Sequence, residues 1–123
     1  MPDSVPATTR PIELVTENGF AILRRWEIDR KPAPVAESYQ FIVRNSQSLE
    51  HEIAVEVADD LFVQIELKTR RGILPESSYW ICCAERHLAT YLWENDDYPP
   101  GDRLRISQLD PEDVMSAIRW KTN

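Results

Sequence analysis

The chain has 123 residues, of which 42% are hydrophobic and 28% are charged, and its formal net charge at pH 7 is −7. Its length suits one domain, and its apolar content is sufficient for a buried core. Because an acidic surface repels the phosphates of nucleic acids and of anionic membranes, we expect neither kind of partner. We predict a flexible tail over residues 1–10, which holds little to bury, and a single domain over residues 11–123.

The first part of the chain is predicted to form antiparallel strands. Asn18-Gly19 between apolar runs predicts a hairpin with a tight type I′ turn, in which both central residues need a positive φ. The strands expected in this part lie at residues 12–16, 20–28 and 39–44.

Alternating apolar residues indicate the strands that follow. Ile53, Val55 and Val57 alternate with Glu52, Ala54 and Glu56, and the same period of two recurs at Val63, Ile65 and Leu67. This period is typical of a sheet with one buried face and one solvated face. Asp59-Asp60 is expected to join the two segments as a tight hairpin.

The pattern changes to a helical period over residues 76–94, with Ser77 or Ser78 as the candidate N-cap. A short strand follows at residues 104–106, and Asp110-Pro111 then begins a second helix. The predicted fold class is therefore α+β. It comprises an antiparallel sheet of about five strands in the order ββββ(β)αβα, a long helix packed on one face, and a short C-terminal helix.

The long helix carries more apolar surface than one buried face requires. Its predicted core face holds Trp80, Ile81, Ala84, Leu88, Tyr91 and Leu92. The opposite face holds Tyr79, Cys82, Arg86, Ala89 and Trp93. Aromatic residues and arginine are typical of interaction hot spots, so this second face is the predicted contact surface for a protein partner or a homodimer. The alternative is that the second face is buried against the N-terminal hairpin or Trp120.

Cys82 and Cys83 are the two cysteines of the chain, and as neighbours they cannot link distant segments. With no apolar run typical of a signal peptide or a membrane span, this pattern predicts a reduced, cytoplasmic protein. Cys83 and His87 are four residues apart, a spacing that suits two metal ligands or a nucleophile with its base. The remaining ligands and an orienting third group are not evident, so we expect no metal and no cofactor. The alternative is that these side chains are small, half-buried and structural.

Glu52 on one predicted strand, with Glu66 and Lys68 on the next, resembles the core of the PD-(D/E)xK nuclease family. By alternation the three side chains lie on one face of the predicted sheet. The resemblance implies that the two carboxylates bind Mg²⁺ and that Lys68 stabilises charge beside a positioned water. The same pattern also suits a solvated face on which opposite charges pair across strands.

The glycines, at 19, 72 and 101, leave no glycine-rich phosphate loop, which argues against P-loop and dinucleotide-binding proteins. We expect a protein-binding or regulatory module without enzymatic activity, as a monomer or as a homodimer through the helix at 76–94. The alternative is a metal-dependent nuclease with Glu52, Glu66 and Lys68 as catalytic residues.

Overall fold

The computed structural model describes residues 13–35, 37–70 and 72–120, so the predicted tail over residues 1–10 lies outside the described part of the chain. The elements in chain order are β1 (Glu13–Val15), β2 (Ala21–Arg24), α1 (Arg25–Ile28), β3 (Ser38–Arg44), β4 (Glu50–Val57), α2 (Asp60–Thr69), α3 (Ser78–Asn95), the short 3-10 helix η2 (Pro100–Asp102), β5 (Arg103–Ile106) and α4 (Pro111–Arg119).

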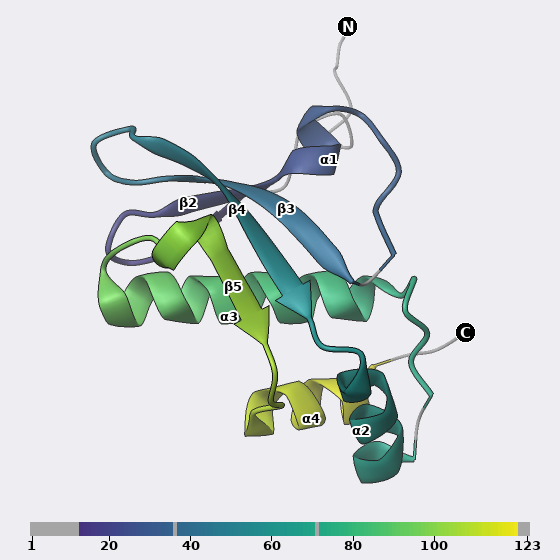
Figure 1. The fold of residues 1–123 in the computed structure, drawn as a ribbon. Helices are drawn as coiled ribbons and strands as arrows, with labels where there is room; N and C mark the ends of the chain where they lie inside the picture. Colours follow the sequence, from purple (N-terminus) through teal and green to yellow (C-terminus); the bar gives the residue numbers. More distant parts are fainter. Residues whose placement is uncertain (1–12, 36, 71, 121–123) are drawn as a thin grey trace, which may run out of the picture.

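The strands form one sheet in the order β1-β2-β3-β4-β5. Neighbouring strands are antiparallel up to β4, whereas β4 and β5 are parallel. The α+β class and the five strands agree with the sequence-based expectation, but the sheet is mixed and not purely antiparallel. A parallel pair needs a long crossover connection. Here α2 and α3 lie in that connection, and α3 runs along one face of the sheet (Figure 1).

The predicted strand after Asp59-Asp60 is wrong, because this segment forms helix α2. Leu61 and Ile65, four residues apart, are buried, whereas Val63 and Leu67 are exposed. The exposed pair creates the period of two in the sequence, but the buried pair has the spacing of a helix face. The edge of β4 that a hairpin strand would occupy is taken by β5.

The first hairpin is confirmed in position, but its turn differs from the prediction. Gly19 has a φ of +93°, whereas Asn18 is not among the residues with positive φ. The amide of Gly19 donates to the Thr16 carbonyl at 3.0 Å, and the amide of Thr16 donates to the Phe20 carbonyl at 2.8 Å. This pattern is typical of a type I turn followed by a glycine bulge, which needs a positive φ at the glycine alone.

The predicted strand over 20–28 is too long, because β2 ends at Arg24 and α1 follows it. The turn of helix allows Trp26 to pack on the rings of Tyr39 and Phe41, with centroids 5.7 and 5.6 Å away. Trp26 is buried there, whereas Ile28 at the end of α1 is exposed. Aromatic packing on β3 therefore ends the strand earlier than the apolar pattern suggests.

The predicted helix starts are confirmed. The Ser77 side chain caps α3 by accepting a hydrogen bond from the Tyr79 amide. Asp110 caps α4, Pro111 occupies the first turn, and Asp113 completes a reciprocal capping box with Asp110. In Figure 1, α4 lies beside α2 at one end of the molecule, and the two helices are in contact.

The loop that leads into β5 is held against β4 by aromatic and polar contacts. His51 Nδ1 lies 2.8 Å from Asp102 Oδ1, and the Tyr98 ring stacks on the His51 ring with centroids 3.7 Å apart. Tyr98 also meets Phe20 edge-on at 5.7 Å. These contacts position η2 so that the chain enters the sheet beside β4.

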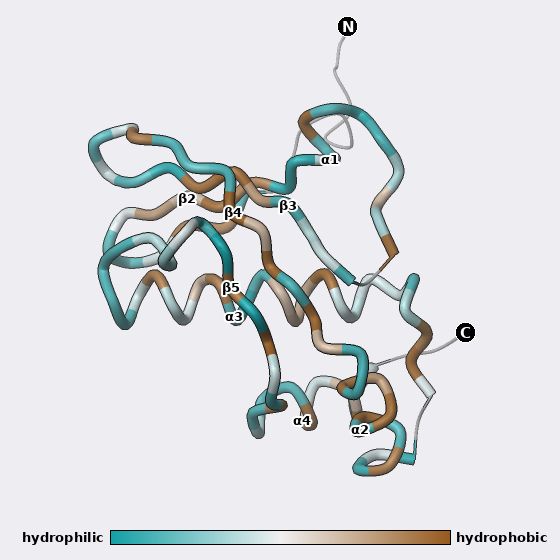
Figure 2. Tube along the Cα trace, viewed as in Figure 1, coloured by the Kyte–Doolittle hydropathy of each residue, from teal (hydrophilic) through white to brown (hydrophobic). Residues whose placement is uncertain are grey.

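The core lies between the sheet and α3. Hydrophobic residues recur along α3 and are concentrated in α2 (Figure 2). The predicted core face of α3 is buried at Trp80, Ile81, Ala84, Leu88 and Leu92. Tyr91 is half-buried. Among the described residues, no helix combines the length and apolarity needed to cross a bilayer.

Candidate functional site

The predicted contact surface on α3 divides into two parts. Tyr79 is 1% exposed and belongs to the core, and Cys82 and Arg86 are half-buried. Trp93, near the C-terminal end of the helix, is 52% exposed. The N-terminal part of this face is therefore packed inside the molecule, whereas its C-terminal part is open to a partner.

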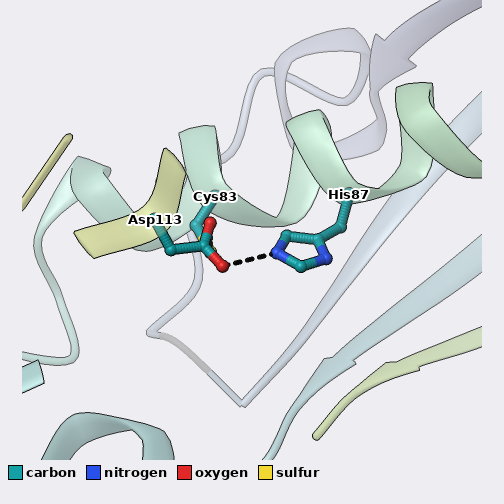
Figure 3. Close-up of side chains that lie close together, drawn as sticks. All are labelled: Cys83, His87 and Asp113. Atoms are coloured by element: carbon teal, nitrogen blue, oxygen red, sulfur yellow. Dashed lines mark hydrogen bonds and ion pairs between the residues drawn. The ribbon is translucent and has the colours of Figure 1, made fainter. Parts of the chain in front are cut away.

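The N-terminal part surrounds a fully buried carboxylate, Asp113 of α4. His87 Nε2 lies 2.7 Å from Asp113 Oδ2, and the Cys83 thiol donates to Oδ1 at 3.3 Å (Figure 3). Arg86 Nη2 also donates to Oδ1, and the Tyr79 hydroxyl donates to the Asp113 carbonyl at 2.7 Å. We call these five residues, four from α3 and one from α4, the Asp113 cluster.

The charges within the Asp113 cluster are matched. Burial alone would raise the pKa of the Asp113 carboxyl, but hydrogen bonds from His87, the Asp110 amide and Arg86 hold it well below its usual value. Burial and the neighbouring Asp113 charge raise the pKa of the Cys83 thiol well above its usual range. Asp113 is therefore a carboxylate at neutral pH, and Cys83 is a protonated thiol that donates to it.

Cys83, His87 and Asp113 offer a sulfur, a nitrogen and an oxygen that all lie within 4.8 Å of one another. These are donor types found in zinc sites, but a zinc-bound cysteine must lose its proton. Here the Asp113 carboxylate is paired with the guanidinium of Arg86 and accepts a hydrogen bond from the Cys83 thiol. The full burial of Cys83 and its raised pKa argue against a nucleophilic thiolate. The geometry fits an ion-pair network that fastens α4 to α3.

The two adjacent cysteines should differ sharply in reactivity. Cys82 is half-buried, whereas Cys83 is 0% exposed and has a raised pKa. In the native protein, a thiol-specific chromogenic disulfide should titrate Cys82 at least ~100-fold faster than Cys83, which reacts only after local opening. Cys82→Ser should remove the fast phase and Cys83→Ser should keep it. Equal reaction rates for the two thiols would contradict the full burial of Cys83.

Comparisons of the chain with models of protein families, with curated proteins and with solved structures find no match.

The residues of the nuclease hypothesis are not arranged as predicted. Glu52 lies on β4, but Glu66 and Lys68 lie on the exposed side of helix α2. The prediction that the three share one sheet face is therefore wrong. Glu52 Oε1 instead lies 3.6 Å from Arg25 Nη1, as expected for charge pairing on a solvated surface.

The C-terminal part of α3 forms one wall of an open groove of about 300 Å³, and β1 forms the other. The lining residues are Leu14, Val15, Thr16, Glu17, Ala89, Thr90 and Trp93. Leu14 on the β1 wall is 37% exposed and Trp93 on the α3 wall is 52% exposed, so both walls present apolar side chains to solvent. The groove arises because β1 is the edge strand of the sheet.

One end of the groove is fixed by the hairpin turn. Asn18 Nδ2 donates to the Leu92 carbonyl at 2.9 Å and to Asp96 Oδ1 at 3.1 Å. These bonds tie the β1–β2 turn to the end of α3. Of the lining residues, Glu17 is the charged one, so this end of the groove is acidic.

Proposed function

We propose that the protein is a binding module without enzymatic activity, and that it contacts its protein partner through the groove between β1 and α3. The observation that carries the proposal is the half-exposed indole of Trp93 on the α3 wall of the groove, with the exposed side chain of Leu14 on the β1 wall. Tryptophan is among the residues that most often dominate binding energy, especially where neighbouring side chains can exclude water around it. The proposed contact surface is thus smaller than the surface predicted on the helix, and of the predicted residues Ala89 and Trp93 line the groove.

The Asp113 cluster fits a structural role in this proposal. Its thiol is buried and protonated, and its carboxylate is already paired with Arg86 and His87. The cluster keeps α3 in place from the end opposite to Trp93. A rigid helix lowers the entropy cost of presenting an aromatic anchor to a partner.

Site-specific photo-cross-linking in cells that naturally express the protein tests this proposal. Replacing Thr90, an exposed residue in the groove, by p-benzoylphenylalanine should yield a discrete adduct heavier than the 14.3 kDa chain. Adding Trp93→Glu should abolish the adduct, because a charged group would then have to be buried in the apolar contact. The matched control carries the photo-reactive residue at Glu112, an exposed position on α4, and should give no such adduct.

Trp93→Glu should leave the fold intact, since surface substitutions usually change stability by less than ~0.5 kcal/mol. Circular dichroism and a urea titration check this. An adduct of twice the monomer mass identifies a homodimer, and any other discrete mass identifies a different protein. The absence of an adduct at position 90, or an adduct that persists in the Trp93→Glu variant, overturns the proposal.

A further inference from the structure

We propose that the partner contributes an extended segment of alternating apolar and basic residues, which pairs as an added strand with the outer edge of β1, the edge away from β2. This inference rests on the proposed function of the groove and specifies the chemistry of its occupant. Addition of a peptide strand to an exposed sheet edge combines backbone hydrogen bonds with side-chain pockets on alternate residues.

The backbone of β1 provides the first argument. In an antiparallel pair, successive residues direct their amide and carbonyl groups alternately toward the partner strand and away from it. Thr16 donates to the Phe20 carbonyl, and Val15 is paired with Ala21 in the register. By this alternation, Leu14 directs its backbone toward β2, whereas Glu13 and Val15 direct theirs outward. Among the described residues, no strand pairs with this outer edge of β1.

The side chains around that edge determine what an added strand would carry. Leu14 pairs with Ile22, which is fully buried, so Leu14 lies on the side of the sheet that faces α3. The residue of an added strand opposite Leu14 would lie over the groove beside Trp93, which favours an apolar side chain. The residues opposite Glu13 and Val15 would lie on the other side of the sheet, where Glu13 favours a basic side chain.

The negative charge of the protein favours a basic partner segment over a second copy of this chain as the occupant of the groove. Glu13 lies on the outer edge of β1, Glu17 lies at one end of the groove, and the whole chain carries −7. A second copy would bring the same negative charge to the contact, whereas a basic segment would be attracted to it. Charge complementarity therefore favours a cationic partner over self-association.

A synthetic heptapeptide of alternating lysine and valine, labelled with fluorescein, is the probe for this inference. Fluorescence anisotropy should show saturable binding to the full-length protein, and the matched peptide of alternating glutamate and valine should bind at least ~10-fold more weakly. Equal binding of the two peptides would overturn the basic character of the partner.

Alternate N-methylation of the probe separates strand addition from simple charge attraction. In an antiparallel added strand, the lysines of the probe lie opposite Glu13 and Val15. Each of these lysines exchanges both backbone hydrogen bonds with the β1 residue opposite it. Methylating the lysine amides should weaken binding ~10-fold or more, because buried carbonyls of β1 lose their donors. Methylating the valine amides should change affinity less than ~2-fold. Equal losses in the two peptides would overturn strand addition.

The two proposals fail in different ways. If the peptides do not bind but a Trp93-dependent adduct forms at position 90, the groove is a binding site and strand addition is rejected. If that adduct has twice the monomer mass, the occupant is a second copy and the basic segment is rejected. If neither the adduct nor peptide binding is observed, both proposals are rejected.

Discussion

Asp113→Asn should lower the free energy of unfolding by about 3 kcal/mol, because it leaves the partly buried Arg86 guanidinium without its counter-charge. The amide is similar in size to the carboxylate, so the loss reports charge and hydrogen bonding and not a cavity. Urea denaturation at neutral pH, followed by circular dichroism, measures it. The matched control is Glu112→Gln, which removes an acid from the same helix turn at an exposed position and should cost less than ~0.5 kcal/mol.

The stability of Asp113→Asn should depend on acid pH less than the stability of the wild type does. The pKa of Asp113 in the folded protein lies below its usual value of 3.8, so the unfolded chain takes up this proton first as the pH falls. The contribution of Asp113 is thus fully present above about pH 5 and is lost progressively at lower pH. The difference in stability between the wild type and Asp113→Asn should therefore narrow below about pH 4. A loss of unfolding free energy under ~1 kcal/mol at neutral pH would contradict the role of Asp113 in fastening α4 to α3, and so would a stability difference between the two proteins that does not change with acid.

Glu85→Gln should destabilise the protein by about 2–3 kcal/mol, because it breaks a second partly buried ion pair. Arg24 on β2 donates from Nε and Nη2 to the two carboxylate oxygens of Glu85 on α3, at 3.1 Å each. The two side chains are only 13% and 10% exposed. The bidentate pair ties the sheet to the long helix, and thermal and urea unfolding measure its loss.

A double variant separates the pair from its desolvation cost. Arg24→Met combined with Glu85→Met removes both charges and should recover most of the stability that Glu85→Gln loses, because apolar residues of similar size often replace a buried ion pair without loss. A double-mutant cycle gives the coupling energy between the two side chains. If the double variant is no more stable than Glu85→Gln, packing around this position or the 3.4 Å pair between Arg24 and Glu27, and not the Arg24–Glu85 pair, limits stability.

The fold was predictable where one local signal dominated. The caps at Ser77 and Asp110 place the starts of α3 and α4 correctly, because side-chain capping depends on neighbouring residues alone. The segment over 60–69 was not predictable in this way, because its apolar residues fit both a strand and a helix. Its helical form follows from β5, which lies far along the chain and takes the position beside β4.

The candidate site shows the same division. Trp93 was recognisable as an apolar residue outside the core face of its helix, although β1 forms the other wall of its groove. Asp113 was recognised only as an early acid of its helix. The sequence did contain a sign of its burial. Asp113 lies four residues before Ala117, so the two share one face of α4, and this is the face that is buried. Its partners Cys83 and His87 lie on another helix, and only the fold brings them together.

The parallel pairing of β4 with β5 also constrains how the chain can assemble during synthesis. Strands β1 to β4 follow one another along the chain, with α1 between β2 and β3, and each pairs with the next, so they can pair soon after they leave the ribosome. The fifth strand and α4 follow only after α2 and α3 have been made. Until then, one edge of β4 is unpaired and Cys83 and His87 lack Asp113. The nascent chain therefore exposes this edge of β4 to other chains or to chaperones until β5 pairs with it.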